Sequence, residues 1–277
     1  MAAALLALAS SITWGVADFS GGMLTRRLPL ATVTVGSQAA GFVLLLMLLA
    51  FSPGLSWHST WLGAIGGLGG GAGLACFYAA LARGTMSIVS PITACSAIVP
   101  VALALGAGER PSSLALAGCG IAVGGAVLAS VEERSSSERG RSDAIVLAVA
   151  AALAIGVFLY FLGRGSQSGS ALSTLVGARI GSLTLLTVWA VATGSALKPT
   201  GRSAAPIALV GLADVAANAL FVVASQHGLI AVVSVLGSMF PIVTVALAHL
   251  VLHERISRVQ RAGVAIASIG VAIVAAA

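Results

Sequence analysis

The chain has 277 residues, of which 58% are hydrophobic and only 8% are charged. A water-soluble protein of this size carries about 25% charged residues, so the composition excludes an ordinary soluble domain. The net charge of +6 comes from 14 basic residues scattered over short loops, unlike the clustered basic surface of a nucleic-acid-binding protein. The sequence therefore predicts an all-α, multi-pass protein of the cell inner (cytoplasmic) membrane, with the lipid bilayer rather than nucleic acid as its partner.

A helix needs about 20 apolar residues to cross the hydrocarbon core of a bilayer. Segments of about that length recur ten times along the chain, at 3–24, 30–51, 61–82, 85–107, 113–131, 144–163, 171–193, 204–226, 229–252 and 260–277. The first is not a secretory signal, because no basic region precedes it and it continues past Asp18 to Arg26.

The longest polar stretch, 132–143, is rich in Glu, Arg and Ser and is expected to be a surface linker between two five-helix units, 1–131 and 144–277. One pattern recurs near the end of each unit at a constant offset of 145 residues. Its members are Glu109, Arg110, Ser112, Ala117, Gly118 and Gly125 in the first unit, and Glu254, Arg255, Ser257, Ala262, Gly263 and Gly270 in the second. We interpret it as a polar turn between two helices, with Ser capping the second helix and the glycines allowing close helix packing.

Because each unit has an odd number of spans, the second unit must enter the membrane from the opposite face. That arrangement is the inverted repeat of secondary transporters, whose substrate site lies near the midplane between the repeats. The alternative is an old gene duplication with no role in transport.

The chain resembles the EamA family of the drug/metabolite transporter superfamily. The resemblance rests on Trp14-Gly15, the two Glu-Arg-x-Ser turns with the Ala-Gly that follows each, and Pro241, thirteen residues before Glu254. It implies ten helices in two inverted repeats, a central cavity and alternating access without ATP. The first unit has Pro100 where the pattern expects a proline at position 96, so the fourth and ninth helices are expected to bend differently.

Four polar groups lie within the predicted spans: Asp18, Arg179, Asp214 and Asn218. Ionisable residues at membrane depth are rare and mark functional sites. Asp214 and Arg179 lie roughly 14 Å and 12 Å from opposite faces at ~1.5 Å per residue, so in a core of ~30 Å they can pair. Such a pair could line a cavity, or it could simply hold two helices together.

Three further residues complete the predicted substrate-binding set. Gln38 is the repeat counterpart of Arg179. Trp14 lies one helical turn before Asp18, where a ring and a carboxylate could attract a cation; alternatively, Asp18 is a carboxylate at the membrane surface near Arg26. Tyr78 is included as an aromatic residue that could face the cavity. We expect no catalytic residue, cofactor or metal site: His249 and His253 have no third ligand at suitable spacing.

The sequence thus predicts a secondary transporter, not an enzyme, that moves a small organic metabolite or drug, with proton-coupled export as one mode. A flippase for a lipid-linked sugar and, less favoured, an intramembrane enzyme remain as alternatives, and the sequence leaves open whether the protein is a monomer or a homodimer.

The charge distribution also predicts an orientation. Loops after odd-numbered spans hold eleven of the 14 basic residues, whereas loops after even-numbered spans hold two. Basic residues in short loops stay on the cytoplasmic side, which places both termini outside. The family resemblance implies both termini inside; we adopt the charge count because it is a property of this chain.

Overall fold

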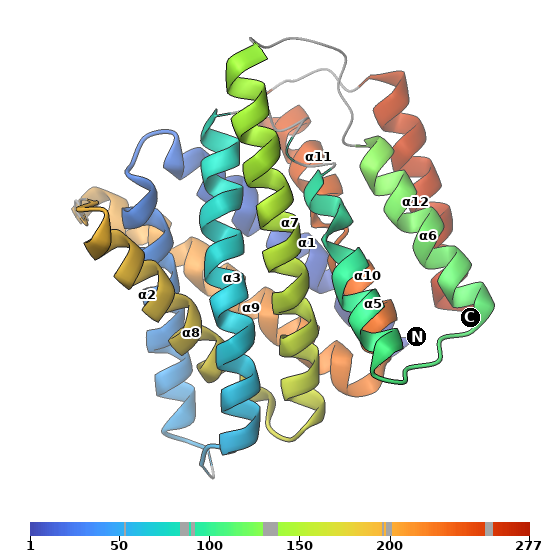
Figure 1. Cartoon of the computed structure of the whole chain (residues 1–277), viewed down its shortest axis with the longest axis horizontal. Coiled ribbons are helices and arrows are strands. Elements are labelled where there is room, and N and C mark those ends of the chain that lie inside the picture. The colour runs from blue at the N-terminus through green and yellow to red at the C-terminus, as the bar shows by residue number, and fades with distance from the viewer. Residues whose placement is uncertain are drawn as a thin grey trace.

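The computed structural model describes residues 1–52, 54–83, 89, 92–129, 138–195, 197, 201–252 and 257–277, and its regular structure within them is entirely helical. The first half contains α1 (Ala2–Thr25), α2 (Leu30–Leu49), α3 (Trp57–Arg83), the 3₁₀ turn η1 (Cys95–Ala97), α5 (Ile98–Gly106) and α6 (Ser113–Ala129). The second half contains α7 (Glu138–Gln167), α8 (Ala171–Ala192), α9 (Gly201–His227), α10 (Ile230–Gly237), α11 (Phe240–Leu252) and α12 (Arg258–Ala276). The long helices run up and down the molecule, with α6 and α12 side by side at one edge (Figure 1).

Seven helices among the described residues are long and apolar enough to cross a membrane: Ala2–Thr25, Leu30–Leu49, Trp57–Arg83, Asp143–Gln167, Ala171–Ala192, Gly201–His227 and Ile230–Val251. Two shorter apolar helices, Ile92–Gly106 and Ser113–Ala129, accompany them. Large apolar side chains are exposed on their outer faces, among them Val191 at 72%, Leu209 at 66% and Met47 at 61%. A surface this apolar fits lipid rather than water.

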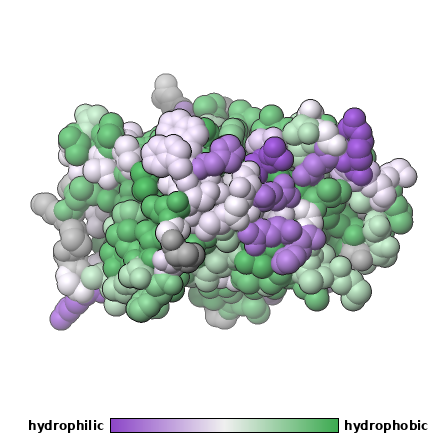
Figure 2. Space-filling model, turned by 90° about the horizontal axis from the view of Figure 1, so that it is seen from below, coloured by the Kyte–Doolittle hydropathy of each residue, from purple (hydrophilic) through white to green (hydrophobic). Residues whose placement is uncertain are grey.

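Hydrophilic side chains gather at the ends of the helices. Figure 2 shows one such group at the end of the molecule seen from below, with apolar side chains around it. This separation of polar ends from apolar sides is the surface expected of helices that span a bilayer.

The structure refines three predicted boundaries. The predicted span 229–252 consists of α10 and α11, which meet at a turn formed by Ser238 and Met239. The described part of the predicted span 85–107 is interrupted by η1, which lies at the equivalent place in the repeat. The fourth predicted span of the first half and its counterpart in the second half are thus both interrupted at equivalent positions. The first is interrupted by the 3₁₀ turn η1, and the second by the turn between α10 and α11. Within the predicted linker 132–143, α7 begins at Glu138, because a helix can continue beyond the hydrocarbon core, and 132–137 lie outside the described residues.

The glycines of the repeated pattern join α6 to α12, as the sequence predicts. A Cβ on Gly125 would lie 2.2 Å from the amide nitrogen of Ala267, and one on Gly270 would lie 2.3 Å from that of Ala122. The two contacts are equivalent under the 145-residue offset, because Gly270 is the counterpart of Gly125 and Ala267 is the counterpart of Ala122. Such reciprocal contacts are expected when the two halves are related by a two-fold axis. The contacting residue numbers fall along α12 as they rise along α6, so the two helices are antiparallel.

A second pair of contacts is reciprocal in the same way. Gly15 of α1 packs against Val243 of α11, and its repeat counterpart Gly156 of α7 packs against Val99 of α5. Absence of a side chain is required at both glycines, since an added Cβ would lie 2.5 Å and 2.6 Å, respectively, from the nearest atom of the other helix. The first helix of each half is therefore held against the broken helix of the other half.

The two serines of the repeated pattern cap helices, also as predicted. Ser112 Oγ accepts a hydrogen bond from Ala115 N at 3.0 Å at the start of α6. Ser257 Oγ accepts one from Gln260 N at 3.2 Å, and the Gln260 side chain accepts one in return from Ser257 N at 2.8 Å. These caps satisfy amide groups that have no partner within the first turn of a helix.

Candidate functional site

A cavity lies between helices of both halves, near the middle of the long helices. Its walls come from α1, α2, α3, α7, α8, α9 and α11, and its residues are Trp14, Asp18, Gln38, Gly70, Leu74, Phe77, Ile155, Phe158, Leu159, Leu175, Ala178, Arg179, Ser182, Asp214, Asn218 and Phe240. The centres of water-sized molecules can occupy about 70 Å³ of it, which is room for several waters or one small solute.

Close helix packing brings α8 and α9 to this cavity. A Cβ on Gly177 would lie 2.0 Å from the carbonyl oxygen of Thr60, so α8 lies directly against α3. Gly211 in α9 has the same relation to Ser37 of α2, again with 2.0 Å to the carbonyl oxygen. Asp214 follows Gly211 by one turn and therefore faces α2 near Gln38. The small residues thus determine where the polar side chains meet.

Arg179 and Asp214 form an ion pair at the centre of the cavity, as their predicted depths allowed. Arg179 Nη2 lies 2.6 Å from Asp214 Oδ2, and the side chains are only 6% and 21% exposed. The charge of Arg179 is removed from water and that of Asp214 largely so, and such a pair is maintained only with good geometry and additional hydrogen bonds.

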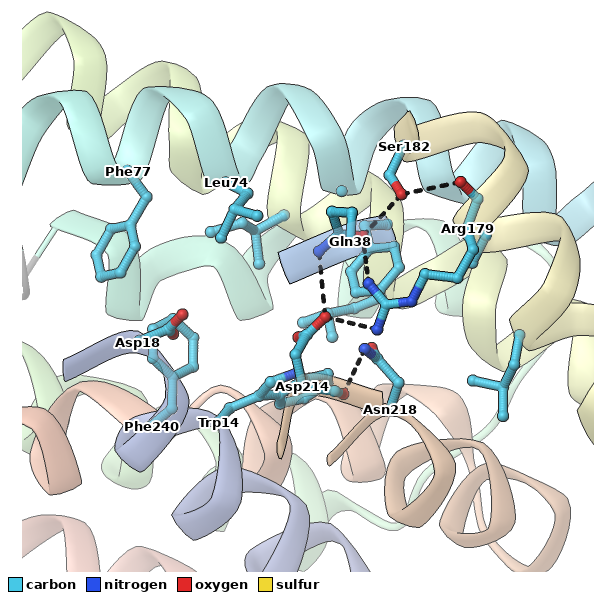
Figure 3. Close-up of a pocket in the computed structure, with 16 residues that line it drawn as sticks. Trp14, Asp18, Gln38, Leu74, Phe77, Arg179, Ser182, Asp214, Asn218 and Phe240 are labelled. Carbon is cyan, nitrogen blue, oxygen red and sulfur yellow. Dashed lines mark hydrogen bonds and ion pairs between the residues drawn. The ribbon is translucent and has the colours of Figure 1, made fainter. Parts of the chain in front are cut away.

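Trp14 and Gln38 supply those hydrogen bonds, and Ser182 in turn bonds to Gln38 (Figure 3). Trp14 Nε1 donates to Asp214 Oδ1 at 3.2 Å, and Gln38 Nε2 donates to Asp214 Oδ2 at 3.3 Å. The Gln38 amide oxygen accepts from Arg179 Nη1 and, at 2.8 Å, from Ser182 Oγ. Gln38 and Arg179, which the repeat predicted to be counterparts, are therefore bonded to each other.

Asn218 lies one turn beyond Asp214 on the same face of α9. Its amide nitrogen donates to the backbone oxygen of Asp214 at 2.6 Å, while its buried amide oxygen has no hydrogen-bond partner among the described residues. Asn218 therefore leaves one acceptor available inside the cavity.

Asp18 differs from the other charged residues of the cavity. It is half-buried and lines the cavity, yet it makes no hydrogen bond or ion pair with any residue that the structure describes. Figure 3 shows it apart from the bonded group around Asp214, at the end of the cavity where Phe77 and Phe240 lie.

Tyr78 is the one member of the predicted set that does not line the cavity. It is 1% exposed, and its hydroxyl lies so near Gly21 that a Cβ there would be 2.0 Å away. Its neighbour Phe77 lines the cavity instead, because successive residues of a helix point about 100° apart.

The sequence reasoning missed Ser182 and most of the apolar wall. Ser182 follows Arg179 by three residues and so shares its helix face, which was the available signal. The apolar wall includes Leu74, Phe77, Phe158 and Phe240. Aromatic residues are as common in the core of helical proteins as in binding sites, so their positions alone could not identify them.

Glu109 has a role outside the cavity that the sequence did not predict. Its two carboxylate oxygens accept hydrogen bonds from the backbone amides of Ile230 and Ala231, each at 3.0 Å. Leu229, the residue before α10, has no polar side chain, so a carboxylate from the other half caps this helix. Its repeat counterpart Glu254 lies outside the described residues.

Comparisons with known proteins agree with this architecture. The model of the EamA-like transporter family matches residues 1–131 and again residues 143–276. A solved crystal structure has a similar fold, with a TM-score of 0.75 and 16% identity over 98% of this chain and 95% of that one. No curated protein matches the chain. Because the family model covers nearly the whole chain in two copies, the chain belongs to the EamA-like transporter family, whose members are membrane transporters.

Proposed function

We propose that this protein is a secondary transporter that moves a small organic metabolite or drug across the cytoplasmic membrane by alternating access, without ATP. The observation that carries the proposal is the central cavity, which is bounded by helices of both halves and combines a buried ion pair with an apolar wall. Binding sites for small organic molecules are mostly apolar with a few converging polar groups, and this cavity has that character.

The reciprocal contacts between the halves support ten spans in two inverted five-helix repeats. Inverted repeats produce antiparallel packing of equivalent helices, as in α6 and α12. They also produce equivalent contacts in the two halves, as in Gly15–Val243 and Gly156–Val99. In transporters of this design the site lies between the repeats, and the repeats move relative to each other around it.

Hydrogen bonds at one end of the molecule suggest which contacts must break as the repeats move. Glu109 of the first repeat caps α10 of the second. Close to that end, Ser56 N donates to Ser173 Oγ at 2.9 Å and Ser170 N donates to Ser59 Oγ at 3.2 Å, which joins the start of α3 to the start of α8. Under the proposal these contacts form when this end is closed and separate when it opens.

We further propose that transport is coupled to protons and operates as export, with Asp214 as a coupling residue. A carboxylate at the centre of the cavity can bind a proton or respond to a substrate, and its pairing with Arg179 would change with occupancy.

Uptake into proteoliposomes tests the proposal, with a solute first identified by thermal-shift screening against cationic drugs, amino acids and sugars. Wild-type protein should accumulate the solute when a pH gradient or a membrane potential is imposed, and Asp214→Asn should lose this response. Because the variant leaves Arg179 unpaired, its folded state is checked by gel filtration. Uptake at the wild-type rate and with the same pH dependence in Asp214→Asn would exclude the coupling role, and absence of uptake of every stabilising solute would exclude transport.

A further inference from the structure

The charges of the central cavity do not balance. Arg179 and Asp214 neutralise each other at 2.6 Å, whereas Asp18 faces the same cavity with no cationic partner among the described residues. A lone carboxylate in an apolar cavity is unfavourable until a positive charge or a proton neutralises it. The cavity therefore lacks one positive charge.

The residues around Asp18 indicate what kind of cation would supply it. Trp14 lies four residues earlier on the same helix face, and its ring is one wall of the cavity. Phe77 and Phe240 lie at the end of the cavity near Asp18, with their ring centres 6.1 Å apart in an edge-to-face arrangement. Aromatic faces beside a carboxylate attract organic ammonium groups, and they would hold an inorganic ion poorly because they replace none of its hydration shell.

The arrangement also argues against an anionic substrate. Arg179, the cation of the cavity, already contacts Asp214 and Gln38 and is only 6% exposed. An incoming carboxylate or phosphate would have to displace Asp214 from it, and Asp18 would repel the same anion. Among the residues that the structure describes, the cavity consequently has no free positive group with which to bind an anion.

We propose that the substrates of this cavity are small organic monocations, amines or quaternary ammonium compounds, with the charged group at Asp18 beside Phe77 and Phe240 and the apolar part against Leu74. This inference rests on the proposed transport function and names the substrate class of the same site. Asp18 is the residue that selects for charge, because Asp214 is already paired with Arg179 before the cation binds.

Binding to the purified full-length protein in detergent tests the proposal. The probes are choline and its neutral analogue 3,3-dimethylbutan-1-ol, which has the same shape with carbon in place of the quaternary nitrogen. We expect saturable choline binding by equilibrium dialysis to the wild type and to Asp18→Glu, binding at least tenfold weaker to Asp18→Asn, and no saturable binding of the neutral analogue. Since Asp18 makes no hydrogen bond or ion pair with any described residue and its charge is unfavourable in the cavity, Asp18→Asn without ligand should melt no lower than the wild type.

Equal binding of choline and the neutral analogue, undiminished choline binding to Asp18→Asn, or no saturable choline binding to the wild type would each overturn the proposal. Uptake of a neutral or anionic solute, unaffected by Asp18→Asn, would overturn the substrate class and leave the transport function standing. Choline binding as expected, together with failure of every uptake assay, would support the cation site and count against transport.

Discussion

The ion pair at the centre of the cavity gives a direct test of the site. Replacing Arg179 by Ala leaves the Asp214 carboxylate without its cation, and removing one partner of a buried pair costs about 3–5 kcal/mol. The loss should be near the lower end of that range, because Trp14 and Gln38 still donate to Asp214 and 21% of its side chain is exposed. Changing Asp214 to Asn as well removes the unpaired charge and keeps one acceptor oxygen, so the double variant should recover part of the loss.

Melting temperatures in detergent measure the effect. A chain of this size loses about 2–4 °C for each kcal/mol, so Arg179→Ala should melt about 6–12 °C below the wild type and the double variant Arg179→Ala/Asp214→Asn above that single variant. Arg164, which is exposed at the end of α7, supplies the control: Arg164→Ala should have the same melting temperature as the wild type. A double variant that melts lower than Arg179→Ala would show that the two residues do not stabilise each other.

Three further predictions concern the repeats and the topology. Gly125→Val should lower the melting temperature strongly because its side chain would meet the backbone of α12, whereas the adjacent Gly124→Val, with open space at its Cβ, should not; equal effects would contradict the packing. Glu109→Gln should speed hydrogen exchange at the first two amides of α10 and cost about 0.5–2 kcal/mol, as for the loss of a helix cap; unchanged exchange would argue against that cap. The excess of basic residues in loops after odd-numbered spans places the loop that contains Ser136 in the cytoplasm; Ser136 itself lies outside the described residues. A cysteine at that position should therefore be protected from an impermeant maleimide in intact cells. Labelling of this cysteine would show that the orientation is the opposite one.

Much of the site could be predicted from single residues because the membrane restricts what a charged residue can do. The depths of Arg179 and Asp214 alone indicate that the two residues can pair, and the structure places them 2.6 Å apart. Ser112 and Ser257 were predicted as caps from their position in a repeated turn, and both cap helices. In each case the partner was either near in sequence or restricted to the same depth.

The remaining features depend on which helices meet, and sequence spacing does not contain that information. The partners of Glu109 are backbone amides more than a hundred residues away, so nothing near Glu109 indicated its role. Tyr78 and Phe77 are adjacent and both aromatic, and only the rotation of α3 decides which of them lines the cavity. At the break between α10 and α11, Pro241 is visible in the sequence, whereas the close packing of Gly15 against Phe240 and Val243 is visible only in the structure.

The central claim is that the cavity opens to each side of the membrane in turn. Leu74 lines the cavity and is not part of the bonded group around Asp214, so Leu74→Cys, in a variant with Cys76, Cys95 and Cys119 replaced, reports on access to it. Val188, 62% exposed on the apolar outer surface, gives the matched control Val188→Cys, which lipid should protect from both sides. In sealed vesicles of each orientation, a small impermeant thiosulfonate should label Leu74→Cys from either side. Labelling from one side only, under every substrate and pH condition, would contradict alternating access.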